Sequence, residues 1–311
     1  MGINAKEIIY YSDIIKILKD IDNIGKNLMP LNWKSVQSFT ADHIYSICYG
    51  NGKFVAGSNN GKMGYSTDGI TWEAISQSFT TYSIISICYG NGKFVAGDNN
   101  GKMAYSTDGI NWTAVSQSII TDFIGSICYG NGKFIAGGNS GKMAYSTDGI
   151  TWTAISQDFT TKYIESICYG NGKFVAGGSS GKMAYSTDGI NWTAISQSFN
   201  TSDVRSICYG NGKFIADGSP NGKMGYSTDG ITWKASQSFT TKYINSICYG
   251  NGKFVAVGES GSMGYSTDGI TWTAINQNIF TDEIHSICYG NGKFMVVGDR
   301  GKMGYFQTGI L

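Results

Sequence analysis

The nine-residue stretch SICYGNGKF, first found at residues 46–54, recurs unaltered with a period of forty residues. Its seven copies begin at Ser46, Ser86, Ser126, Ser166, Ser206, Ser246 and Ser286. A fixed period of this length is the sequence signature of a repeat architecture, in which each repeat is one supersecondary unit. The fold of most of the chain therefore follows from the local structure of one repeat.

Each repeat predicts four short antiparallel strands. The pair Asn51-Gly52 readily takes positive φ at both central positions of a type I′ turn, so the residues on either side of it predict a tight hairpin. The remaining parts of the repeat are a glycine-rich turn at 57–61, a strand at 62–66, a Thr67-Asp68-Gly69 turn and a fourth strand carrying Trp72.

The two ends of the repeat array complement each other. Six tryptophans follow an STDG turn, whereas Trp33 precedes the first hairpin and has no such turn before it. The last repeat passes Tyr305 and has no tryptophan of its own, so we expect a strand at residues 31–36 to complete the sheet of residues 286–306. An open array would instead need atypical polar caps at both ends. The prediction is an all-β chain, with a seven-bladed β-propeller of four-stranded antiparallel blades over residues 31–311.

Residues 1–30 lie outside the repeat and predict a short amphipathic helix. Ser12 is suited to cap its N-terminus. An amphipathic helix buries its apolar face, either against its own propeller or against another chain, and the sequence leaves both open. In the second case the segment mediates partner docking or self-association through Ile14, Ile17, Leu18, Ile21 and Ile24.

Composition excludes several classes of partner. The formal net charge is +1 and there is no run of Lys or Arg, so we expect no nucleic-acid binding. No stretch reaches the roughly 18 apolar residues of a spanning helix, and the N-terminus lacks a charged-then-apolar leader. We therefore expect a protein made in the cytoplasm without a signal peptide and without membrane insertion.

All seven cysteines occupy one repeat position: Cys48, Cys88, Cys128, Cys168, Cys208, Cys248 and Cys288. Neighbouring copies then lie on adjacent sheets about 10 Å apart, whereas a disulfide needs Cα atoms within about 7 Å. We predict small, buried, reduced side chains that form neither disulfides nor a metal site.

The turn before each tryptophan resembles a known motif. The runs YSTDGITW at residues 65–72 and YSTDGINW at 105–112 are similar to the Asp-box (BNR) signature Ser-x-Asp-x-Gly-x-Thr-Trp, although they lack the residue usual between Asp and Gly. That signature occurs on the blades of sialidases, bacterial surface-binding and lectin-like propellers, and phage tail proteins. The resemblance implies the propeller fold and a recognition role. The box itself is a folding motif, in which Asp68 accepts backbone N–H groups and Trp72 packs between sheets.

The chain lacks the residues of a sialidase active site. Sialidases of this shape hold a substrate carboxylate with three arginines, and this chain has only Arg205 and Arg300. We find no other catalytic motif, so we predict a protein that is not an enzyme and that needs no cofactor.

The chain has two histidines, His43 and His285, and they can approach each other where the first and last repeats meet. With Asp42, Asp282 and Glu283 beside them they would suit a metal or an acid–base pair. The alternative is a solvated polar loop, which we favour, so we predict no catalytic residue and no metal site. The turn aspartates each bring one carboxylate, too few for calcium.

The seven copies differ from one another mainly just before the hairpin and in the turn between the second and third strands. In a four-stranded meander both segments emerge at one end, so the variable residues share one face of the disc. We predict ligand binding there by Asp42, His43, Tyr45, Tyr82, Phe123, Tyr163, Glu165, Arg205, Tyr243, Asn245, Glu283 and His285. The alternative is that exposed loops simply tolerate change.

Together these observations lead to two hypotheses about function. The first is a non-enzymatic binding propeller that recognises a carbohydrate or cell-surface ligand as part of a phage tail or tail-like particle, where several similar sites add avidity. The second is a structural scaffold or assembly subunit that mates with a protein partner through one propeller face.

Overall fold

The computed structural model describes Lys16 and residues 32–156, 161–196, 202–218 and 221–307. Two compact units are present, Met1–Asn32 and Trp33–Leu311. The predicted helix, with its proposed docking residues Ile14 to Ile24, lies outside the described residues, so everything below concerns the second unit. In the described part of the chain no helix has the length and apolarity to cross a bilayer.

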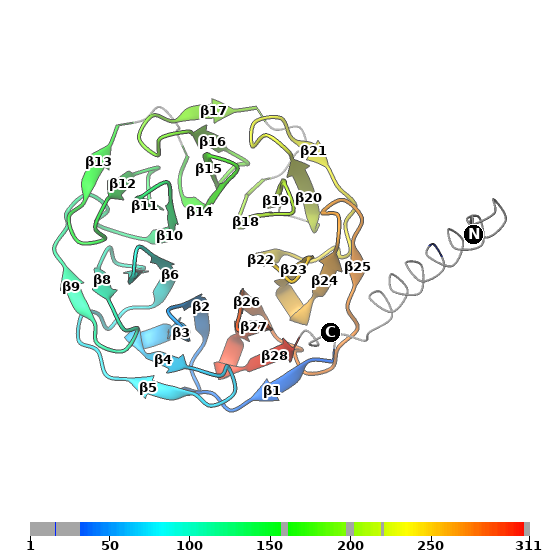
Figure 1. Ribbon diagram of the computed structural model, residues 1–311, viewed down its shortest axis with the longest axis horizontal. Coiled ribbons are helices and arrows are strands. Elements are labelled where there is room, and N and C mark those ends of the chain that lie inside the picture. The colour runs from blue at the N-terminus through cyan, green and yellow to red at the C-terminus, as the bar shows by residue number, and fades with distance from the viewer. Residues whose placement is uncertain (1–15, 17–31, 157–160, 197–201, 219–220, 308–311) are drawn as a thin grey trace, which may run out of the picture. The chain divides into compact units, whose positions relative to one another are not determined.

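The second unit consists of seven four-stranded antiparallel sheets, which confirms the predicted propeller (Figure 1). Blades 1 to 4 comprise β2 (Ile44–Gly50), β3 (Lys53–Ser58), β4 (Met63–Ser66) and β5 (Glu73–Ile75); β6 (Ile84–Gly90), β7 (Lys93–Asp98), β8 (Met103–Ser106) and β9 (Thr113–Val115); β10 (Ile124–Gly130), β11 (Lys133–Gly138), β12 (Met143–Ser146) and β13 (Thr153–Ile155); and β14 (Ile164–Gly170), β15 (Lys173–Gly178), β16 (Met183–Ser186) and β17 (Thr193–Ile195).

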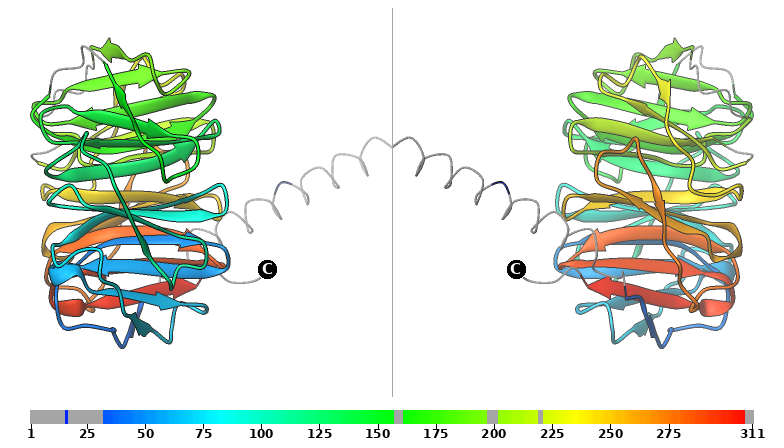
Figure 2. Two further views of the ribbon diagram at one scale, coloured as in Figure 1. Left: turned by 90° about the vertical axis from the view of Figure 1, so that its left-hand side faces the viewer. Right: turned by 90° about the vertical axis from the view of Figure 1, so that its right-hand side faces the viewer.

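Blades 5 to 7 comprise β18 (Ile207–Gly210), β19 (Lys213–Gly218), β20 (Lys223–Ser227) and β21 (Lys234–Ala235); β22 (Ile244–Gly250), β23 (Lys253–Gly258), β24 (Met263–Ser266) and β25 (Thr273–Ala274); and β26 (Ile284–Gly290), β27 (Lys293–Gly298), β28 (Met303–Gln307) and β1 (Lys34–Val36). Three 3₁₀ turns, η1 (Asn59–Gly61), η2 (Glu259–Gly261) and η3 (Asp299–Gly301), join second and third strands. The first strand of each blade is innermost, and the strands run from one face of the disc to the other (Figures 1 and 2).

The N-terminal strand closes the circle as predicted. β1 pairs antiparallel with β28, with Lys34 opposite Tyr305 and Val36 opposite Met303. The Trp33 side chain is 4% exposed, and its ring centroid lies 6.1 Å from that of Phe306. Blade 7 is therefore built from both ends of the repeat array.

The predicted local turns are also present. Asn51 and Gly52 have φ values of 45° and 73°, as a type I′ turn requires. Asp68 Oδ1 accepts the N–H groups of Ile70 at 2.7 Å and Thr71 at 2.8 Å. The prediction that the fourth strand contains Trp72 is wrong, since β5 begins one residue later. The indole instead packs among core residues of blades 7 and 1, so its place is set by packing between sheets rather than by the strand ladder.

Adjacent blades are joined by residues of the repeated stretch itself. The serine that begins each copy accepts the backbone N–H of the isoleucine in the next copy, as Ser166 Oγ does from Ile207 at 2.8 Å. This hydrogen bond occurs at all seven junctions, including the closing one between Ile47 N and Ser286 Oγ at 3.4 Å. These bonds satisfy inner-edge N–H groups that have no partner strand.

Candidate functional site

In six of the seven blades, backbone hydrogen bonds among the described residues hold the two variable segments together. Asn59 N donates to His43 O at 2.9 Å, and Asp299 N donates to Glu283 O at 3.0 Å. Each bond joins the turn after a second strand to the connector that enters the inner strand of the same blade. We call the face formed by these connectors and turns the variable face.

The opposite face carries the near-constant turns, and we call it the constant face. Asn131 Nδ2 donates to Thr187 O at 3.4 Å, which joins the hairpin turn of blade 3 to the STDG turn of blade 4. The same bond recurs at other junctions, for example from Asn211 to Thr267 at 3.3 Å. The constant turns thus interlock neighbouring blades, which gives a structural reason for their uniformity.

A β-bulge at the start of the inner strand presents one variable residue of each blade. In β2 the pairing register shifts between Ile44 and Ser46, so Tyr45 is the bulged residue. Five other blades repeat this shift, and a bulge changes the direction of a side chain relative to a regular strand. The bulged residues of blades 1 and 7, Tyr45 and His285, contact each other, with ring centroids 4.8 Å apart.

Blade 5 holds the start of its inner strand with a buried aspartate instead of a bulge. Its inner strand β18 begins only at Ile207, and Asp217 Oδ1 accepts the N–H groups of Arg205 at 2.8 Å and Ser206 at 2.7 Å. The Asp217 side chain is fully buried, and burial raises its pKa to about 8 against the lowering effect of these two N–H groups and of the Arg205 charge.

Predicted residues from three blades form one polar arc on the variable face. Arg205 Nη1 donates to Asn245 Oδ1 at 3.2 Å, and Asn245 Nδ2 donates to Glu283 Oε1 at 2.8 Å. The Arg205 guanidinium also lies 4.5 Å from the centre of the Tyr243 ring. Burial, reinforced by Asp203 and opposed by Arg205, raises the pKa of Glu165. The arc offers a charged, hydrogen-bonding surface with an aromatic edge.

The two histidines meet where blade 7 closes against blade 1, as predicted. His43 Nδ1 lies 2.5 Å and His285 Nε2 lies 2.8 Å from the same oxygen, Asp299 Oδ1. The Tyr45 ring centroid is 4.8 Å from that of His285. Burial alone would raise the pKa of Asp299, but hydrogen bonds from both histidines outweigh it and lower that pKa. Among the described residues, this is the cluster that brings three metal-ligating side chains together.

The expected acidic partners of the histidines were wrong. Asp42 instead pairs with Lys62 at 2.9 Å, Asp282 pairs with Lys302 at 2.9 Å, and Glu283 accepts from Asn245. Asp299 lies in one of the variable turns between second and third strands, and no motif in the sequence alone connects it with the histidines. The available signal was that turn's position, because turns after second strands share a face with the connectors that carry His43 and His285.

The predicted aromatic residues differ in how far they are available to a ligand. Tyr82 is 50% and Tyr243 is 36% exposed. Phe123 and Tyr163 instead pack edge to face, with ring centroids 5.7 Å apart, and Lys162 Nζ lies 5.1 Å from the Tyr163 ring. Tyr82 and Tyr243 are therefore the rings best placed to stack on a bound molecule.

The cysteines line the central channel, and six of the seven are only partly buried, whereas buried side chains were predicted. They share a cavity of about 400 Å³ with the isoleucine and tyrosine on either side of them in each copy. All seven thiols are free. Burial raises the pKa of Cys48, Cys168 and Cys248 to about 12, so these thiols stay protonated and poorly nucleophilic.

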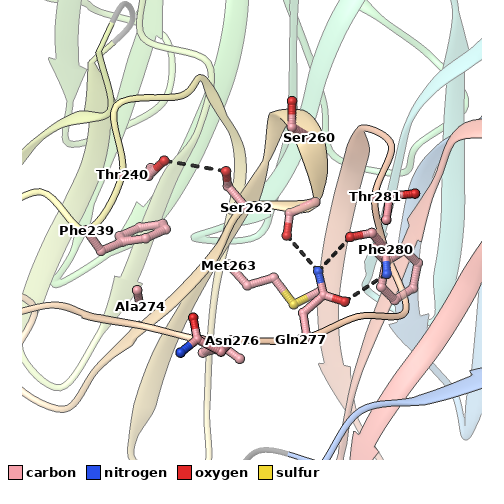
Figure 3. Close-up of a pocket in the computed structure, with 12 residues that line it drawn as sticks. Phe239, Thr240, Ser260, Ser262, Met263, Ala274, Asn276, Gln277, Phe280 and Thr281 are labelled. Atoms are coloured by element: carbon pink, nitrogen blue, oxygen red, sulfur yellow. Dashed lines mark hydrogen bonds between the residues drawn. The ribbon is translucent and has the colours of Figure 1, made fainter.

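A second pocket, of about 450 Å³, lies beside β24 and β25 in blade 6 and contains none of the predicted ligand-binding residues (Figure 3). Gln277 Nε2 donates to Gly261 O and Phe280 O, both at 2.8 Å. The equivalent Gln117 makes the same pair of bonds in another blade. The amide therefore joins the turn at Gly261 to the connector at Phe280. This role is structural, so we assign the pocket to the propeller scaffold rather than to ligand binding.

No protein-family profile and no curated protein matches this sequence. The structure is similar to virginiamycin B lyase from Staphylococcus aureus, with a TM-score of 0.78 and 14% identity over 89% of this chain and 99% of that one. It is also similar to "YCF48 bound to D1 peptide", with a TM-score of 0.72 and 16% identity over 89% and 95%, and to the WD40 propeller domain of Doa1, with a TM-score of 0.70 and 14% identity over 89% and 97%. At these identities the likeness shows the seven-bladed propeller fold alone. It supports neither an Asp-box family nor a phage-tail setting.

Proposed function

We propose that this chain is a non-enzymatic recognition propeller that binds its ligand on the variable face. The observation that carries the proposal is the division of the molecule into two faces. Seven copies of one scaffold interlock through uniform turns on the constant face, while the differences among copies are gathered on the other. A binding surface built on a rigid scaffold has this arrangement.

A carbohydrate is the ligand we propose. Tyr82 and Tyr243 expose flat rings suited to stacking on a sugar face, and the arc of Arg205, Asn245 and Glu283 supplies donors and acceptors for hydroxyl groups. Similar shallow sites on one face would engage a repetitive cell-surface glycan with avidity. A phage tail or tail-like particle is the setting we propose for such a protein.

The test is a glycan array probed with the purified protein and two variants. Tyr243→Ala removes an exposed ring and the cation–π partner of Arg205, and we expect it to reduce binding at least about tenfold. Ile70→Ala removes an exposed side chain (44%) from the constant face and should leave binding unchanged. Failure of the wild-type protein to bind any cell-surface glycan would overturn the carbohydrate proposal.

A protein partner is the second candidate. The propeller described as YCF48 bound to D1 peptide shows that this fold can hold a peptide, and the charged arc at the channel mouth suits a peptide of mixed charge. A peptide array probed with the same three proteins distinguishes the two candidates. Peptide binding that is lost in Tyr243→Ala, together with a negative glycan array, would favour the protein partner.

The proposal that the chain is not an enzyme has its own test. A hydrolase would have to use the two histidines, so activity of the wild-type protein on glycoside substrates that disappears in His285→Ala would contradict it.

A further inference from the structure

The cluster of His43, His285 and Asp299 has the chemistry of a transition-metal site. Two imidazole nitrogens and one carboxylate oxygen all lie within 4.8 Å of one another. Imidazole and carboxylate ligands suit divalent first-row metals such as Zn²⁺, and three protein ligands with one open position are typical of an accessible zinc site.

The distances fit a metal with small adjustments. Ligand atoms bound tetrahedrally to Zn²⁺ are about 3.4 Å apart. The two nitrogens lie 2.5 and 2.8 Å from Asp299 Oδ1 and within 4.8 Å of each other. Each must therefore move away from the oxygen by about 1 Å or less, while the separation of the two nitrogens settles near about 3.4 Å. A metal would then replace the protons that now link both histidines to the carboxylate.

The surroundings support a defined site rather than a mobile surface cluster. His285 is 15% and Asp299 is 23% exposed, whereas His43 is 42% exposed and leaves one side open to solvent. The backbone of His43 is held by Asn59 N, and that of Asp299 by Glu283 O. Nearby acidic residues are occupied, since Asp282 pairs with Lys302 and Asp42 with Lys62.

We propose that these three residues bind one divalent transition metal of the zinc type, which bridges blade 7 to blade 1. His43 enters blade 1, while His285 and Asp299 belong to blade 7, so the ligands are up to 256 residues apart in the chain. The bound metal stabilises the junction between blades 7 and 1, which β1 also closes. The Tyr45 ring lies beside both ligating histidines, with its centroid 6.3 Å from that of His43 and 4.8 Å from that of His285.

The experiment is calorimetric titration of Zn²⁺ into full-length protein that carries no polyhistidine tag and has been freed of metal with a chelator. We expect one site per chain with a micromolar or lower Kd, weakened at least about 100-fold in His285→Gln and in Asp299→Asn. Glu259→Gln is the matched control, because Glu259 holds the equivalent turn position in blade 6 and the chain's only two histidines are at the other junction. Zn²⁺ should also raise the Tm of the wild type and of Glu259→Gln but not of the other two variants.

The channel thiols are the competing ligands, and Co²⁺ distinguishes them. A site of two imidazoles and one carboxylate gives a Co²⁺ absorption spectrum without thiolate-to-metal charge-transfer bands. This spectrum is recorded on the wild-type protein, so it tests the proposal even if a variant fails to fold. Charge-transfer bands in the wild type, binding no tighter than millimolar, or equal binding by folded His285→Gln and Asp299→Asn would each overturn the proposal.

Discussion

Substitution of Gly130 by alanine tests how the blades are held together. Gly130 ends β10, and a Cβ atom there would lie 2.1 Å from Cγ and 2.5 Å from Cβ of Tyr169 in blade 4. Non-bonded carbon atoms approach to about 3.5 Å, so the tyrosine would have to move by more than about 1 Å. Its ring is held 4.7 Å from that of Phe174, which is fully buried. Overpacking of this kind costs about 3 kcal/mol.

Gly132→Ala is the control for this substitution. Gly132 lies two residues later in the same hairpin and has a φ of +74°, but a Cβ there would meet nothing within 4 Å. Its substitution should cost only the strain of the left-handed conformation, about 1 kcal/mol. The difference between the two variants isolates packing between blades from backbone strain.

The assay is urea unfolding followed by circular dichroism, with a double-mutant cycle through Tyr169→Gly, because alanine would keep the Cβ atom that lies 2.5 Å from the added one. We expect the cost of Gly130→Ala to fall to about 1 kcal/mol or less once both the ring and the Cβ atom of Tyr169 are absent. The reasoning is refuted if Gly130→Ala costs no more than Gly132→Ala, or if its cost is the same with and without Tyr169.

Three further predictions concern the other devices of the fold. Ser166→Ala removes the acceptor of the Ile207 N–H and should cost about 1 kcal/mol in urea unfolding, and no loss would show that water replaces the hydroxyl. The pKa of Asp217 is raised to about 8, so the folded carboxyl keeps its proton to higher pH than the unfolded one, and stability should fall as pH rises from about 4 toward 8, by at most about 1.4 kcal/mol per unit. Asp217→Asn should remove this contribution, and identical pH profiles of the two proteins between pH 5 and 7.5 would contradict it. Trp33→Ala removes a buried ring from the closing junction and should cost about 3 kcal/mol, whereas a cost below about 1 kcal/mol would mean that closure does not depend on it.

The local structure could be predicted because each feature depends on residues close together in sequence. Asn51-Gly52 specifies its own turn, and Asp68 caps N–H groups two and three residues later. Closure was predictable for a different reason. The position of Trp33 before the first hairpin shows that the array begins with the strand that its last blade needs.

The site was only partly predictable. The meeting of His43 and His285 followed from closure, but their carboxylate partner did not, because Asp42, Asp282 and Asp299 all lie near the junction and only side-chain directions distinguish them. The cysteines show the same limit, since one repeat position fixes their equivalence but not whether they face the core or the channel.

The repeat, its turns, the number of blades and the way the circle closes can all be read from the sequence, because they depend on periodicity and on short-range hydrogen bonding. The pairing of charged groups at the junction, and the hydrogen bonds by which SICYGNGKF joins neighbouring blades, became visible only in the folded molecule. Those outcomes depend on contacts between residues that are 14 to 256 positions apart, and such contacts exist only once the strands and blades have packed against one another.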